Sequence, residues 1–201
     1  WDVLFAGAGM DSPRSDSGQW RLKLEQSLDM GALTRLSGEL YRVEVDHLMD
    51  NYSLRPLSGL FKMRVPTESD STGGRLLADL SAAGMDWTLG LDYLSVARDA
   101  TRYWNYRSTS VTVPQSYMWP DVEQGDLGLF AEAQRALGPA GSLTAGLRYD
   151  HVESGLSEAR ANSLPTGPAW VLSPNQLYRT YYGKTAEDDS EDNLGGLLRY
   201  G

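Results

Sequence analysis

His47 and Met49 stand two positions apart and together offer two donors that bind soft metal ions. On an extended segment, residues i and i+2 point to the same side, so the His47 imidazole and the Met49 thioether can reach one ion. A thioether is a poor ligand for hard cations, and paired with imidazole it suits copper, particularly Cu(I). The spacing therefore makes His47 and Met49 candidate copper ligands, although a bare His-x-Met pair is a weak signal. Taken alone, His47 would by default be interpreted as an ordinary hydrogen-bonded loop histidine.

Other residues that could carry chemistry indicate less. His151 has no methionine nearby, and we interpret it as structural. Met10, Met63 and Met118 fall in segments that we predict as loops, where they either fill gaps in packing or make transient contacts with Cu(I). The sequence contains no nucleotide-binding glycine loop, no H-E-x-x-H and no G-x-S-x-G. Nothing in it points to an enzyme.

The composition excludes several classes of protein. The chain has 201 residues, with 18 Lys and Arg against 27 Asp and Glu and a formal net charge of −9. This acidic balance lacks the basic footprint that nucleic-acid binding needs. Because there is no Cys, there is no disulfide framework and no thiolate metal ligand. The apolar runs are far shorter than the roughly 20 residues of a membrane helix, whereas the alternating strands of a membrane β-barrel keep mean hydropathy low.

Period-2 alternation of apolar and polar residues recurs along the chain, and helical periodicity does not. Within 34–46 the apolar positions change parity between Leu40 and Tyr41, which either a β-bulge or a change of surroundings explains. Aromatic residues near the predicted strand ends indicate the girdle of a membrane barrel, namely Trp20, Trp87, Tyr93, Tyr149 and Tyr200. The alternation predicts seven strands, at 19–27, 34–46, 74–82, 87–96, 126–136, 142–152 and 193–200.

Short and long connections alternate between these strands. Soluble domains seldom repeat structureless loops above about 15 residues, whereas outer-membrane barrels join strands by short periplasmic turns and long extracellular loops. The predicted fold class is therefore all-β, an antiparallel transmembrane β-barrel, with a β-sandwich buried on one face as the alternative. The predicted turns are 28–33, 84–86 and 138–141, and the predicted loops are 47–73, 99–125 and 153–192.

Residues 1–201 are predicted to form part of one β-barrel domain. The N-terminus shows no signal peptide, and both ends resemble cuts through a longer chain. Seven strands leave two open edges, which neither water nor lipid tolerates well. We therefore expect the strands to belong to a larger closed barrel.

Several segments resemble TonB-dependent outer-membrane receptors. GDLGLFAEA at 125–133 and LTAGLRYD at 143–150 resemble a hairpin of that family in which a G-x-F-x-E strand precedes a G-x-R-Y-D strand, and WTLGLDY at 87–93 is similar to another such strand. VDHLMDNYSLR at 45–55 resembles the H-x-M segment of TonB-dependent copper receptors of the OprC/NosA type. The barrel resemblance covers most of the chain, while the copper resemblance rests on 45–55.

The resemblance implies a receptor of the bacterial outer membrane that captures copper at the extracellular face and imports it in a TonB-dependent manner. In that family, His and Met of H-x-M bind copper together with a Cys and a Met from an N-terminal plug. The barrel half of this site falls on His47 and Met49, and the plug half has no counterpart here, because the sequence has neither Cys nor a plug region. The implied whole is a 22-stranded barrel surrounded by lipid and lipopolysaccharide, with copper as its cargo and TonB as a partner through the plug.

Two other functions stay open on the sequence. The first is a TonB-dependent receptor for a siderophore or another metal chelate, in which the H-x-M pair is incidental. The second is a surface-binding β-protein, such as an adhesin, that transports nothing.

Overall fold

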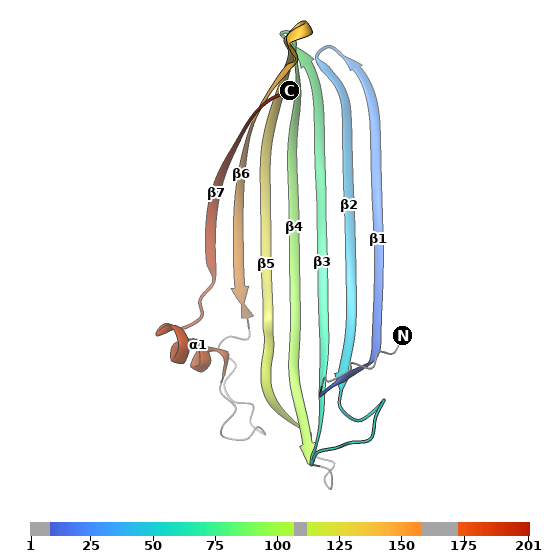
Figure 1. Cartoon of the computed structure of the whole chain (residues 1–201), viewed down its shortest axis with the longest axis vertical. Helices are drawn as coiled ribbons and strands as arrows, with labels where there is room; N and C mark the ends of the chain where they lie inside the picture. The colour runs from blue at the N-terminus through green and yellow to red at the C-terminus, as the bar shows by residue number, and fades with distance from the viewer. Residues whose placement is uncertain (1–8, 107–111, 158–172) are drawn as a thin grey trace.

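Seven antiparallel strands form one sheet in the order β1-β2-β3-β4-β5-β6-β7, so each strand pairs with its neighbours in sequence (Figure 1). The computed structural model describes residues 9–106, 112–157 and 173–201. The strands are β1 (Asp11–Met30), β2 (Leu33–Asp50), β3 (Phe61–Ala82), β4 (Met85–Tyr106), β5 (Val113–Ala136), β6 (Ser142–Leu156) and β7 (Asp189–Tyr200), with a short 3-10 helix, Gly138–Ala140, and one α-helix, α1 (Pro174–Tyr182).

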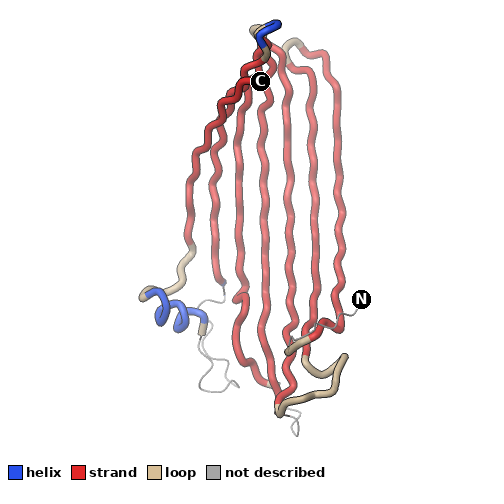
Figure 2. Tube along the Cα trace, in the orientation of Figure 1, coloured by secondary structure: helices blue, strands red, loops and turns tan. Residues whose placement is uncertain are grey.

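The two ends of the sheet differ. The turns after β1, β3 and β5 lie together at the upper end in Figure 2, which we name the turn end. Ala83 and Gly84 both have positive φ, as the tight hairpin between β3 and β4 requires. Segment 51–60 and helix α1 lie at the opposite end, which we name the loop end. The sheet therefore has the hairpin arrangement expected from the sequence.

The strand register sorts the side chains onto two faces, because residues directly opposite each other in a ladder point the same way. Leu24 and Leu76 on the apolar face are 66% and 47% exposed. Trp20, Tyr93 and Tyr149 lie toward its loop end, while Trp87 and Tyr200 lie toward its turn end. The apolar face also carries Leu22, Leu36, Leu40, Leu89, Leu91, Leu127, Leu129 and Leu147.

This uncovered apolar face excludes the β-sandwich. A sandwich would bury the face against a second sheet, yet the described residues form a single sheet. Their buried apolar residues are few, namely Val65, Ala100 and Ala186. Among the same residues, no helix is long and apolar enough to cross a membrane.

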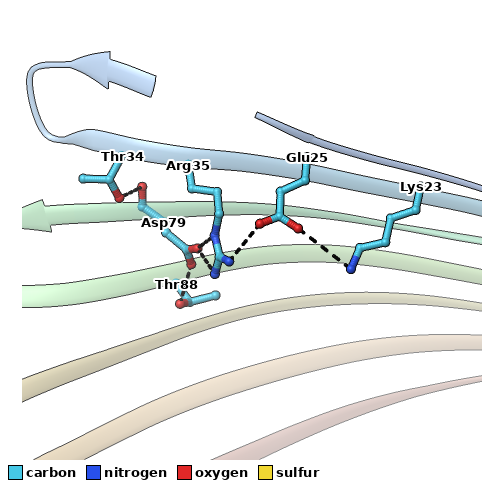
Figure 3. A network of polar contacts seen from close by, with 6 residues as sticks. All are labelled: Lys23, Glu25, Thr34, Arg35, Asp79 and Thr88. Atoms are coloured by element: carbon cyan, nitrogen blue, oxygen red, sulfur yellow. Dashed lines mark hydrogen bonds and ion pairs between the residues drawn. The ribbon is translucent and has the colours of Figure 1, made fainter. Parts of the chain in front are cut away.

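The opposite face, the polar face, is held together by charged side chains from several strands. Near the turn end, Arg35 Nε on β2 donates to Asp79 Oδ2 on β3 at 2.5 Å, and Arg35 Nη1 lies 3.3 Å from Glu25 Oε1 on β1 (Figure 3). Thr88 on β4 donates to the other oxygen of Asp79 at 2.8 Å. One arginine and one aspartate thus link four strands across this face.

A second charged cluster on the polar face brings together four residues of the G-x-F-x-E and G-x-R-Y-D motifs, namely Gly128, Phe130, Arg148 and Asp150. Arg148 on β6 reaches across β5 to Asp92 on β4, with two N–O distances of 2.8 and 2.9 Å, and its Nε donates to Asp150 at 2.9 Å. Its guanidinium carbon lies 5.7 Å from the centroid of the Phe130 ring. Gly128 leaves the space over β5, because a Cβ there would overlap the Arg148 guanidinium.

All seven predicted strands are present, and each is longer than predicted. The predicted loops 47–73 and 99–125 are wrong over much of their length, since β2, β3, β4 and β5 extend into them. The predicted loop 153–192 is shortened at both ends by β6 and β7, and residues 107–111 and 158–172 of these loops lie outside the described residues. The alternation that marks the apolar face ends there, but backbone pairing continues with polar and apolar residues mixed on the two faces. The parity change between Leu40 and Tyr41 is no bulge, because the register there is unbroken, and a change of surroundings remains as its cause.

Helix α1 lies within the predicted loop 153–192 and was missed. Ser173 caps it by accepting from the backbone N–H of Gln176, the Gln176 side chain accepts from the Ser173 backbone, and Gly183 ends it in a left-handed conformation. This Ser-Pro-x-Gln start with a terminal glycine is a readable helix signal. A search for amphipathic periodicity alone misses it, because the helix has only 9 residues.

Candidate metal site at the loop end of strand β2

His47 and Met49 lie among the last paired residues of β2, and both side chains are on the polar face. His47 is opposite Ser15 on β1 and Thr67 on β3, and Met49 is opposite Val65. Both residues are partly exposed, whereas Val65 is buried. The predicted extended geometry is therefore present, and the imidazole and the thioether stand on the same side of one strand.

Asp50, directly after Met49, turns the chain out of the sheet. Its carboxylate accepts hydrogen bonds from the backbone N–H groups of Tyr52 and Ser53, at 3.0 and 2.8 Å, and from the Ser53 hydroxyl. Asp50 is only 1% exposed. An aspartate that bonds to backbone groups two and three residues ahead makes a turn of fixed shape, so the end of β2 is well defined beside the two candidate ligands.

Asn51 joins the end of β2 to the start of β3. Its amide side chain donates to the Phe61 carbonyl at 3.1 Å and accepts from the Met63 N–H at 2.8 Å, while its own N–H donates to the Met63 carbonyl at 3.2 Å. Met63 thereby holds a fixed position on β3. By register it is the diagonal neighbour of Met49 on the polar face.

Arg55 fastens the following segment back to β1. Its guanidinium forms a bidentate pair with the Asp11 carboxylate, and Asp11 is fully buried. The hydrogen bonds to Asp11, together with its charge, raise the pKa of Arg55 above its ordinary value. The neighbouring Ser12 is 1% exposed, and its hydroxyl oxygen lies 3.5 Å from His47 Nδ1. Most polar residues of 50–55 therefore have a positioning role around His47 and Met49.

The donors brought together here suit a soft ion but supply only part of a coordination shell. The described residues contain no group of three or more His, Cys, Asp or Glu side chains that could hold a metal. His47 and Met49 offer one imidazole and one thioether, and Met63 offers a second thioether on the adjacent strand. This set favours a copper-like ion over a hard cation.

Other residues singled out in the sequence lie elsewhere. Met63 and Met118 are in strands β3 and β5, and not in loops as predicted. Met118 Sδ accepts from Arg102 at 3.6 Å. His151 is on the apolar face of β6, between Asp192 at 2.7 Å and Glu153 at 3.2 Å.

Sequence reasoning missed the supporting residues Asp11, Ser12 and Asn51. Asp11 and Ser12 are separated from His47 by 35 or more positions, so only the pairing of β1 with β2 brings them together. Asn51 carried a readable signal, because the Asp-Asn dipeptide after a strand is a common turn start.

Replacing Arg55 with alanine is expected to loosen segment 51–60. The change removes two charge-assisted hydrogen bonds from a buried carboxylate and should cost about 2 kcal/mol of local stability. Limited proteolysis should then cleave 51–60 much faster than in the parent. Arg14→Ala is the matched control, since the Arg14–Asp16 pair is 61% and 65% exposed and should contribute little. Equal cleavage in parent and Arg55→Ala would contradict the anchoring role.

The sequence comparison decides the family. The sequence model of the family described as "TonB dependent receptor-like, beta-barrel" matches residues 4–188. The chain belongs to this family. TonB-dependent receptors are outer-membrane proteins of Gram-negative bacteria, and the apolar face of such a barrel meets lipid while the polar face lines its interior. His47 and Met49 therefore lie on the interior wall.

Solved structures agree with the fold, and 27 chains match. One of these structures, "Copper transporter OprC", aligns with a TM-score of 0.75 at 19% sequence identity. The alignment covers 99% of this chain and 29% of the OprC chain, so this chain spans under a third of that length. No curated protein sequence matches the chain.

Proposed function

We propose that this chain is the copper-binding part of the barrel wall of a TonB-dependent receptor that captures copper at the extracellular face and imports it. The observation that carries the proposal is the placement of His47 and Met49 side by side on the interior face of β2, at the loop end. In barrels of this class the long connections face outside and the short turns face the periplasm. A soft ion arriving from outside would therefore meet these two donors early.

The remaining ligands would come from outside the described residues. A cysteine thiolate and a further thioether from a plug inside a 22-stranded barrel would complete a soft shell around the ion. TonB would act on that plug, and the strands described here would keep the barrel half of the site in place. The copper ion is cargo in this scheme and leaves with the plug rearrangement.

Metal counting on the full-length gene product, purified from outer membranes, tests the proposal. The protein is loaded with copper, zinc and iron in competition, and bound metal is measured by mass spectrometry. We expect near-stoichiometric copper in the parent and about a hundredfold weaker copper binding in both His47→Ala and Met49→Ala, at the upper end of the loss that the removal of a supporting residue causes.

Two control variants make the result specific. His151→Ala removes the other histidine, which is on the lipid-facing side, and Met30→Ala removes a methionine at the turn end. Both should bind copper as the parent does. Equal metal in the parent, His47→Ala and Met49→Ala would exclude both residues from the site, and would leave a receptor for a siderophore or another chelate as the better reading.

A further inference from the structure

The lipid-facing side of β1 to β4 contains a groove of about 400 Å³ with an apolar lining. Gly38 and Gly74 form its floor. In register, Gly38 sits between Leu24 and Leu76, and Gly74 sits between Leu40 and Tyr93. Gly38 leaves an open space in a row of leucines, since a Cβ there would meet its nearest neighbour, Leu76 Cδ1, at 3.8 Å. Over Gly74 the Leu40 side chain takes up the space and forms one wall of the groove. The floor strands β1 to β4 lie side by side in Figure 1.

The groove ends at a charged boundary on its loop-end side. The next row on the same face contains Arg42, directly opposite Trp20 on β1 and Thr72 on β3. Beyond Arg42 the face becomes acidic, with Glu44 opposite Asp70. Tryptophan is enriched where hydrocarbon meets headgroups, so the row of Trp20 and Arg42 marks the headgroup level of the outer leaflet.

Arg42 is held at this boundary by its acidic neighbours and stays accessible. Its Nη2 lies 2.7 Å from Glu44 Oε1 and 3.8 Å from Asp70 Oδ1, and its side chain is 44% exposed. Exposed ion pairs of this kind contribute little, so a doubly charged phosphate can compete for the guanidinium, which binds phosphate through a planar fork of donors.

We propose that this groove is a specific lipid site, in which one acyl chain of an outer-leaflet lipid lies over Gly38 and beside Leu40 while its phosphate contacts Arg42. The groove is continuous with the lipid-facing surface of the barrel, and Arg42 borders it on that surface where a phosphate would be, whereas Arg75, which also lines the groove, belongs to the polar face. An acyl chain fills the space over Gly38, and there it makes more contacts than on an unbroken row of leucines. The site is independent of copper binding.

The test measures lipid that stays bound to the full-length protein, purified from outer membranes and washed extensively with detergent. Intact protein is analysed by native mass spectrometry and the retained lipid is identified. We expect one phosphate-bearing lipid per parent protein, at least a fivefold loss in Gly38→Leu, and a partial loss in Arg42→Gln. A Cβ at position 38 meets Leu76 Cδ1 at 3.8 Å, an ordinary contact, so Gly38→Leu fills the groove without displacing the strands.

Ala78→Leu is the matched control. Ala78 is on the same face, one row nearer the turn end, and it does not line the groove. This variant should retain lipid as the parent does. Complete loss of lipid from the parent on washing, or equal retention in Gly38→Leu and Ala78→Leu, would overturn the proposal. A retained lipid without phosphate would overturn the assignment of Arg42.

Discussion

Gly128→Val is expected to destabilise the sheet by about 2–3 kcal/mol, because the new side chain displaces the Arg148 guanidinium and its charged hydrogen bonds to Asp92 are lost. A Cβ at position 128 would overlap the Arg148 guanidinium and lie 2.6 Å from Asp92 Oδ1. Arg148 would then have to leave Asp92, which is 18% exposed and keeps only the longer 3.5 Å pair with Arg75 in this cluster. The folded fraction on heating, measured for the full-length protein in detergent, reports the loss.

Gly146→Ala is the control for this variant. Gly146 is on β6 of the same hairpin, and a Cβ there would meet its nearest neighbour, the Ala131 carbonyl oxygen, at 3.5 Å. The added methyl group has room, so heating should give nearly the parent curve. If Gly128→Val and Gly146→Ala melt alike, Arg148 is not held over Gly128 in the folded barrel.

Leu76→Arg and Leu77→Arg are expected to have very different effects on the amount of folded protein in the outer membrane, although the two residues are adjacent. Leu76 is on the apolar face between Gly38 and Leu91, so Leu76→Arg places a charge in lipid at a cost of about 2–4 kcal/mol near the bilayer centre. Leu77 is on the polar face between Ser37 and Gly90. There the new charge faces the polar interior, and Asp79 two residues on offers a partner.

The comparison measures folded protein in outer membranes for the two variants produced side by side. Leu76→Arg should reduce it strongly and Leu77→Arg should not. The reverse order would mean that the faces are assigned the wrong way round. Comparable loss in both variants would mean that the polar face is not the interior of the barrel.

The fold was largely predictable because the alternation of apolar and polar residues within each strand indicates which side chains share a face. Leu22 and Leu24 were predicted to share the apolar face and do so in the sheet, as do Leu89 and Leu91. The lengths of the strands were not predictable in this way. Past Arg42 and Thr72 the apolar face becomes mostly polar while Val43, Val45 and Val65 lie on the opposite face, so the alternation that marks the first part of these strands does not continue.

The candidate site was predictable only for residues close in sequence. His47 and Met49 are two positions apart, so strand geometry alone puts them together. Asp11 and Arg55 are 44 positions apart, and nothing in either local segment indicates their pairing. Arg148 and Asp92 are 56 positions apart, and their contact depends on a glycine in the intervening strand. Side chains that fix a site from a neighbouring strand need the register before they can be named.

The strictly sequential order of the strands has a consequence for biogenesis. Every pairing among the described strands joins a strand to the one just before or just after it, so no pairing has to close a loop over an intervening strand, and the entropy cost of closure rises only slowly even for the longer connections. The sheet can therefore grow by one strand at a time from either edge, with each completed strand acting as the template that sets the register of the next. Within these seven strands, assembly needs no long-range search, and a defect in one strand, such as Gly128→Val in β5, would halt growth at that strand while leaving the earlier ones paired.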